Sequence, residues 1–174
     1  MNLSMYQASI PVCMRMFRNL VGILEKGAAC ADTRGIDPSV FLNARLFPDM
    51  FPLIRQVQVA TDIGKRGAER LAGDEVTFVE DDETSFGELI ERVRAVISYM
   101  DGLSPDQVDG KEDEPITFRL RGQDVTFSGS DFLLNFVMPN VYFHITTAYN
   151  ILRHNGVDLG KPDYLGKFEG VNYG

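Results

Sequence analysis

Apolar residues recur three or four positions apart in four separate stretches of the chain, the spacing that places side chains on one face of an α-helix. In the first stretch, Pro11 lies within this stripe, which predicts either a kink in the helix or a late start near Ser9. A glycine and an Asp-Pro step at positions 35–38 end the region. The apolar stripe consists of Leu3, Tyr6, Ile10, Cys13, Phe17, Leu20 and Leu24.

The second stretch predicts a helix that Asp49 caps, with Pro52 in its first turn and Gly73 at its end. Gly64 and Gly67 lie inside this helix, where each glycine costs about 1 kcal/mol. We therefore expect a neighbouring helix to approach closely at these two positions. The stripe consists of Met50, Leu53, Val57, Ala60, Gly64, Ala68 and Leu71.

The third helix has a strong start signal, because Ser85 and Glu88 have the spacing of a capping box. Its apolar stripe consists of Phe86, Leu89, Val93, Val96 and Met100. A polar, acidic connector follows, and then the segment ITFRLRGQDVTFSG alternates apolar and polar residues around a glycine. This alternation predicts a β-hairpin near residues 115–128.

The fourth helix is expected to begin after Ser130 and to end at Gly156. Two polar residues, Asn140 and His144, occupy its otherwise apolar stripe one turn apart, so both are predicted to project inward. The stripe consists of Leu133, Val137, Asn140, His144, Ala148 and Ile151.

These elements predict an all-α fold, a four-helix bundle with a short β-hairpin before the last helix. The bundle is expected to comprise residues 1–156. The aromatic segment 157–174 is expected to pack on the bundle or on a partner subunit, and we predict a homodimer on that ground.

Composition narrows the class of protein. The chain has 174 residues, 44% of them hydrophobic, and a formal net charge of -8. It carries no basic run, so we expect no nucleic-acid binding, and no apolar run long enough to predict a membrane span. Cys13 and Cys30 fall in one predicted helix roughly 25 Å apart, too far for a disulfide. Together with the absence of a signal-peptide pattern, this indicates a cytoplasmic protein.

Three segments carry a family resemblance: SMYQASIPV, LNARLFPDMFPLIRQVQ and NVYFHITTAYNILRHNGVDLGKPDYLG. They resemble the bacterial family called domain of unknown function 1993, within the DinB/YfiT-like superfamily of four-helix bundles. Many DinB-like relatives bind a divalent metal through three histidines, and some are thiol-dependent transferases or isomerases.

The resemblance implies that only part of this metal site is present. His144 matches the second histidine of the His-x-x-x-His pair on the fourth helix, Asn140 replaces the first, and the second-helix position falls near Gln58 or Val59, with Gln56 one turn away. An amide is a poor replacement for imidazole as a metal ligand. We therefore expect no metal cofactor; if a divalent metal binds, His144 would hold it.

The candidate site residues are Asn140, His144, Gln56, Gln58, Asn43, Arg45 and Asp49. The first four would form a polar pocket, and the last three belong to a loop that could cover the open end of the bundle, where Arg45 could bind a substrate carboxylate. Three functions stay open: a small-molecule-binding bundle or metal-free enzyme, a metal-dependent transferase or isomerase, and a structural or interaction protein. No motif in the chain identifies a reaction.

Overall fold

Four long helices pack around one apolar core in a computed structural model that describes residues 3–167. They are α1 (Met5–Arg34), α3 (Leu53–Ala72), α4 (Phe86–Asp101) and α7 (Met138–His154). The shorter elements are α2 (Pro38–Leu42), α5 (Pro105–Val108), β1 (Pro115–Leu120), β2 (Gln123–Ser128), α6 (Gly129–Asp131), the π-helix η1 (Phe132–Val137) and α8 (Lys161–Leu165). The predicted all-α bundle with a hairpin before the last helix is confirmed.

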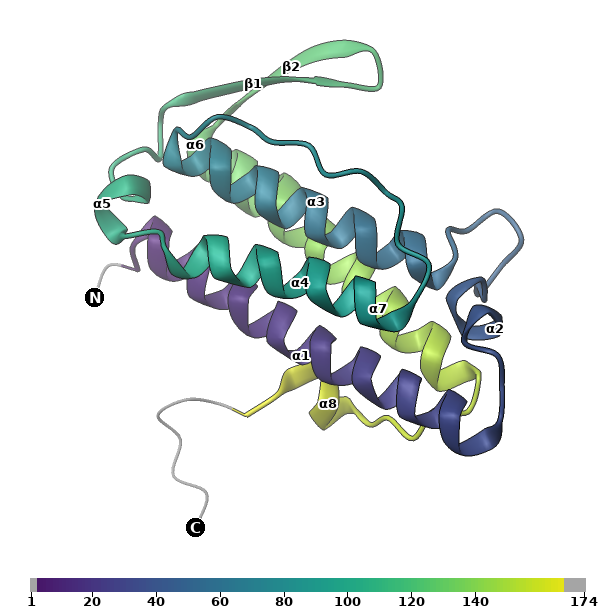
Figure 1. The fold of residues 1–174 in the computed structure, drawn as a ribbon. Helices are drawn as coiled ribbons and strands as arrows, with labels where there is room; N and C mark the ends of the chain where they lie inside the picture. The colour runs from purple at the N-terminus through teal and green to yellow at the C-terminus, as the bar shows by residue number, and fades with distance from the viewer. Residues whose placement is uncertain (1–2, 168–174) are drawn as a thin grey trace.

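Each long helix packs mainly against two others: α1 and α3 both contact α4 and α7. Figure 1 shows that α3 and α4 run in the same direction, opposite to α1 and α7. Parallel neighbours need a long return connection. Residues 74–85 make it as an extended strap that runs back over α3 and α4 (Figure 1).

The sequence predicted either a kink in the first helix at Pro11 or a late start near Ser9, and α1 starts before both positions. Ser4 caps it in a full capping box, and Pro11 lies inside it, so a late start near Ser9 is wrong. Ser9 is itself buried in the helix, and its hydroxyl donates to the Met5 carbonyl oxygen at 2.7 Å. Leu3 precedes the cap and is 73% exposed, so it does not belong to the core.

Helix α3 starts later than predicted, and Asp49 does not cap it. The N-cap residue is Pro52, without a side-chain cap, and Asp49 is exposed in the preceding loop. The physical reason is that a proline disfavours helical backbone at the residue before it. Phe51 therefore cannot continue a helix from Asp49 into Leu53.

The glycines of α3 allow the close packing that the sequence predicted. A Cβ atom placed on Gly64 would lie 2.5 Å from Cζ of Phe17 in α1. On Gly67 it would lie 2.8 Å from Cγ1 of Val137. Neither contact is possible for a larger residue without displacement of the neighbour, so glycine is required where α3 meets α1 and η1.

The hairpin has the predicted place, with β1 antiparallel to β2. Arg121 and Gly122 form its turn with φ of 49° and 83°, the two positive values of a type I′ turn. Ser128 rather than Ser130 then caps the following helix, because its hydroxyl accepts from the Asp131 amide.

The start of the fourth helix differs from a regular α-helix. Residues 132–137 form π-helix, whose wider turn shifts the positions that follow. As a result Val141 is fully buried, whereas Asn140 is half-buried. The prediction that Asn140 projects into the core beside His144 is therefore wrong.

The described part of the C-terminal segment contacts its own bundle. Asp163 pairs with Lys26 at 2.7 Å, and the Tyr164 carbonyl oxygen accepts from Asn19 at 2.9 Å. Figure 1 shows α8 against the outer side of α1. Phe168 and Tyr173 of the aromatic segment 157–174 lie outside the described residues, and the homodimer stays a prediction.

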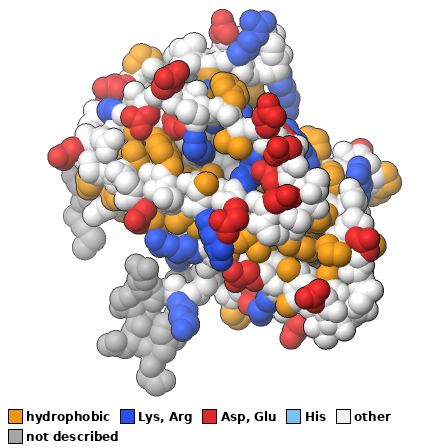
Figure 2. Space-filling model, in the orientation of Figure 1, with side chains coloured by type: hydrophobic (Ala, Val, Ile, Leu, Met, Phe, Trp, Pro, Cys, Tyr) orange, Lys and Arg blue, Asp and Glu red, His pale blue; other side chains and the backbone are white. Residues whose placement is uncertain are grey.

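Two surface properties bear on the predicted partners. Within residues 3–167, no helix combines the length and the apolarity needed to cross a membrane. On the face seen in Figure 2, acidic, basic and apolar side chains are mixed, and neither charge covers the whole face.

Cys13 and Cys30 are both free, as their predicted separation required.

Candidate functional site

His144 of α7 is buried against α3, where its partner is Gln56. The Nδ1 atom of His144 lies 2.7 Å from Oε1 of Gln56, and Nε2 of Gln56 donates to the Phe51 carbonyl oxygen at 3.0 Å. The second bond fixes the orientation of the amide, so its oxygen must accept from the histidine. The proton of a neutral His144 is therefore on Nδ1, and Nε2 keeps a lone pair.

The surroundings of this imidazole disfavour its charged form. Burial lowers the pKa of His144 below its usual range, and the nearby charge of Arg55 lowers it further. In residues 3–167 no side chain or backbone group is hydrogen-bonded to Nε2 of His144. The site therefore offers one neutral nitrogen acceptor.

His144 lines a small pocket of about 200 Å³. Its wall includes the ring of Phe143, which meets the imidazole edge-on with centroids 5.2 Å apart. Phe143 and Phe51 are about half exposed, at 56% and 49%, so the pocket has an apolar rim. The lining residues are Asp49, Met50, Phe51, Gln56, Phe143 and His144.

The pocket thus brings together three of the seven predicted candidates: Asp49, Gln56 and His144. The other four have different partners. The Asn140 amide donates to the Phe136 carbonyl oxygen at 2.6 Å, and the Gln58 amide donates to Glu83 at 2.8 Å. Asn43 caps the end of α2, with a bond to the Ser39 carbonyl oxygen, and Arg45 donates to the Met50 carbonyl oxygen at 3.5 Å.

The donors around His144 do not fit a protein-bound divalent metal. Such a site usually takes three imidazole, thiolate or carboxylate ligands. Here Asn140 is bonded to the backbone, Gln56 is bonded to both His144 and Phe51, and only Asp49 offers a carboxylate. Across the described part of the chain, no three His, Cys, Asp or Glu side chains are grouped to hold an ion.

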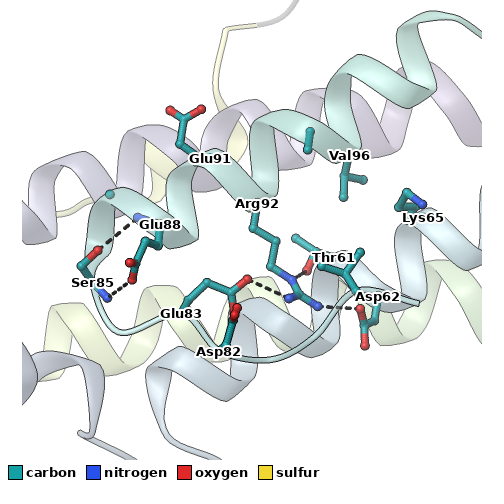
Figure 3. A pocket seen from close by; sticks show the side chains of 13 residues that line it. Thr61, Asp62, Lys65, Asp82, Glu83, Ser85, Glu88, Glu91, Arg92 and Val96 are labelled. Atoms are coloured by element: carbon teal, nitrogen blue, oxygen red, sulfur yellow. Dashed lines mark hydrogen bonds and ion pairs between the residues drawn. The ribbon is translucent and has the colours of Figure 1, made fainter. Parts of the chain in front are cut away.

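Sequence reasoning missed a second polar centre, at Arg92 of α4. Its side chain is 4% exposed and pairs with Asp62 at 2.7 Å, Glu83 at 2.8 Å and Asp81 at 3.0 Å. It also donates to the Thr61 hydroxyl and the Glu80 carbonyl oxygen. Figure 3 shows the guanidinium between Thr61 and Asp62 of α3 and Glu83 of the strap.

Arg92 borders a larger cavity of about 670 Å³ between α3, α4 and the strap (Figure 3). All three of its nitrogens are engaged within the protein, which leaves it little to offer a ligand. We therefore assign Arg92 to the attachment of the strap. A signal for this attachment is present in the sequence: an acidic run at positions 80–83, followed by a helix that contains an arginine.

Comparison with known proteins agrees with the fold. The family described as Domain of unknown function (DUF1993) matches residues 5–165. A crystal structure of a DinB family member from Shewanella denitrificans superposes with a TM-score of 0.89, at 40% sequence identity. The alignment covers 96% of this chain and 94% of that chain. The comparison with curated proteins found no match. With nearly all of its bundle matched, from the start of α1 to the end of α8, the chain belongs to the DUF1993 family.

Proposed function

We propose that this protein binds a small molecule in the pocket at His144 and that it does so without a metal ion. One observation carries the proposal: a buried imidazole at the pocket, whose Nδ1 is held by Gln56 and whose Nε2 has no partner among the described residues. A fixed acceptor at an apolar pocket is how proteins orient ligands.

The lining residues define the chemistry of the ligand. Nε2 of His144 accepts a hydrogen bond, and the Asp49 carboxylate at the rim favours a positive charge. Phe51 and Phe143 suit an apolar group. The pocket is smaller than the roughly 300–1,000 Å³ of drug-sized sites. The ligand class is therefore a small alcohol or amine with an apolar body.

A structural role is a second candidate function, and a specific observation favours it. Gln56 uses both ends of its amide, one on His144 and one on Phe51, so it ties α7 to α3 and to the preceding loop. A buried polar pair of this kind can fix the register of helices. In that case the free Nε2 of His144 would have no ligand.

The third function, a metal-dependent thiol transferase or isomerase of the DinB-like kind, has less support. Its chemistry requires an ion, and His144 is the only imidazole at the site. We therefore rank the metal-dependent function below the other two. A metal titration of untagged protein tests it.

The test of ligand binding uses the fact that the chain has only two histidines, His144 and His154. We would titrate ¹⁵N-histidine-labelled protein with benzylamine and with benzyl alcohol. We expect a saturable change at Nε2 of His144 and none at His154, which lies at the exposed end of α7. Asp49→Asn should weaken the binding of benzylamine more than that of benzyl alcohol.

The same experiment separates the two leading functions. If His144 does not respond to either probe, and His144→Leu leaves the protein folded with altered stability, the structural role is correct. If His154 responds equally, the binding is non-specific and the proposed site is wrong.

A further inference from the structure

A second cleft, of about 320 Å³, lies between α3, strand β1, the π-helix η1 and Phe78 of the strap. It shares no lining residue with the His144 pocket. Besides Phe78, its most distinctive lining residues are three arginines and three further phenylalanines: Arg66, Arg70, Arg119, Phe118, Phe132 and Phe136.

The charge in this cleft is not balanced. Among its described lining residues, Asp62 is the one carboxylate, and it pairs both with Arg66 at 3.0 Å and with Arg92 at 2.7 Å. Arg70 and Arg119 form no ion pair within residues 3–167. Positive charge therefore accumulates here although the chain carries a net charge of -8.

The arginines of the cleft have hydrogen-bond donors that are not used within the described residues. Nε of Arg66 is buried and has no hydrogen-bond partner in the described part of the chain. Arg70 donates one bond, to the Arg66 carbonyl oxygen at 3.2 Å. Burial lowers the pKa of Arg70, the neighbouring charge of Arg66 lowers it further, and the charge of Glu69 opposes both effects. An anion between Arg66 and Arg70 would be attracted to both positive charges.

Aromatic rings form the apolar wall of the cleft. Phe132 and Phe136, four positions apart in η1, are stacked with ring centroids 5.7 Å apart. Phe118 of β1 packs against both, at 5.5 Å and 5.1 Å. The guanidinium of Arg70 lies 5.0 Å from the centre of the Phe118 ring, so charge and aromatic surface meet at one place.

We propose that this cleft is a binding site for a small aromatic carboxylate. The planar guanidinium of arginine matches a carboxylate with two parallel hydrogen bonds. The phenylalanine wall provides an apolar, aromatic surface for the ring of the ligand. Neither an inorganic anion nor a neutral aromatic compound would use both halves of the cleft.

Benzoate is the probe, and benzamide is its neutral counterpart of the same shape. Fragments of this size bind with dissociation constants on the order of 1 mM. We would record the arginine Nε–Hε signals of ¹⁵N-arginine-labelled protein during titration. We expect benzoate to shift Arg66 and Arg70 saturably and benzamide to bind at least tenfold more weakly.

Matched variants localise the site. Arg70→Met removes a charge that has no ion-pair partner in the described residues and should weaken benzoate at least tenfold, by the loss of a charge-assisted hydrogen bond. Arg119→Gln changes an exposed hairpin residue, leaves the core intact, and should weaken benzoate several-fold. Arg94→Met, on the exposed side of α4, should have no effect.

Three results would overturn the proposal. The first is benzamide binding as tightly as benzoate. The second is inorganic phosphate competing as well as benzoate, which would show general anion binding. The third is unchanged benzoate affinity in both Arg70→Met and Arg119→Gln.

Discussion

Nδ1 of His144 and Oε1 of Gln56 lie 2.7 Å apart although 88 positions separate the two residues in the chain. This one hydrogen bond joins α7 to α3 in the interior of the bundle. Because Gln56 also donates to Phe51, the bond extends to the loop that precedes α3. The orientation of the imidazole, and therefore the free Nε2 at the pocket, depends on Gln56.

Gln56→Leu should destabilise the protein by about 1–3 kcal/mol, because it leaves a buried N–H of His144 and the Phe51 carbonyl oxygen without their partner. Urea unfolding measures the loss. Asn43→Ala is the control: this exposed amide bonds only within α2, and its loss should change stability by no more than about 0.5 kcal/mol. Equal losses of stability in the two variants would show that the His144–Gln56 bond contributes no more than an exposed one.

The pKa of His144 predicts a loss of stability on mild acidification. Burial lowers this pKa in the folded state below its ordinary value of 6.5. As the pH falls through 6.5, the unfolded chain gains a proton that the folded protein does not, so the free energy of unfolding decreases until the lower folded pKa is reached.

His144→Gln should abolish this component of the pH dependence, and His154→Gln should not. The measurement is urea unfolding of the three proteins at several pH values from just above to well below 6.5. If the free energy of unfolding of His144→Gln still decreases with falling pH in this window, other groups cause the decrease.

Arg92→Met should destabilise the protein by about 3–5 kcal/mol, because removal of one member leaves buried carboxylates unpaired. It should also release the strap, which limited proteolysis between residues 74 and 85 detects. Arg94→Met is a matched control, since this arginine is 52% exposed in its ion pairs with Glu25 and Glu91. It should cost no more than about 1 kcal/mol.

Gly64→Ala should destabilise the protein by about 1–3 kcal/mol through overpacking, because the new methyl group would meet the ring of Phe17. Gly87→Ala tests the opposite case. This glycine is exposed in the first turn of α4, and a Cβ there would have its nearest neighbour, the Ser85 hydroxyl oxygen, at 3.8 Å. It should stabilise the protein by about 0.5–1 kcal/mol. Thermal unfolding of both variants checks the contrast.

Untagged protein should bind neither zinc nor nickel with one-to-one stoichiometry, because one imidazole and one exposed carboxylate are too few ligands. Isothermal titration calorimetry is the measurement, and His144→Ala is the control. Tight binding by the wild type that disappears in His144→Ala would establish a metal site and reject the metal-free proposal.

The sequence by itself determined the elements whose signals are local. The stripes of α1, α3 and α4, the capping box at Ser85 and Glu88, and the turn of the hairpin all depend on residues within a few positions of one another. Gly64 and Gly67 even indicated close helix packing. Such features can be read from a chain because their energies arise inside one helix or one turn.

Only the tertiary structure decided which polar groups meet. The π-helix moved Asn140 out of the core. Gln56, not Asn140, became the partner of His144, and the strap brought acidic residues onto Arg92. These pairings join segments far apart in the chain, and a shift of a single residue in a helix rotates each later side chain by about 100°, since 3.6 residues complete one turn. Polar contacts require an exact direction, whereas an apolar stripe tolerates such a shift. The sequence therefore predicted the fold but only three of the residues that line the pocket, Asp49, Gln56 and His144.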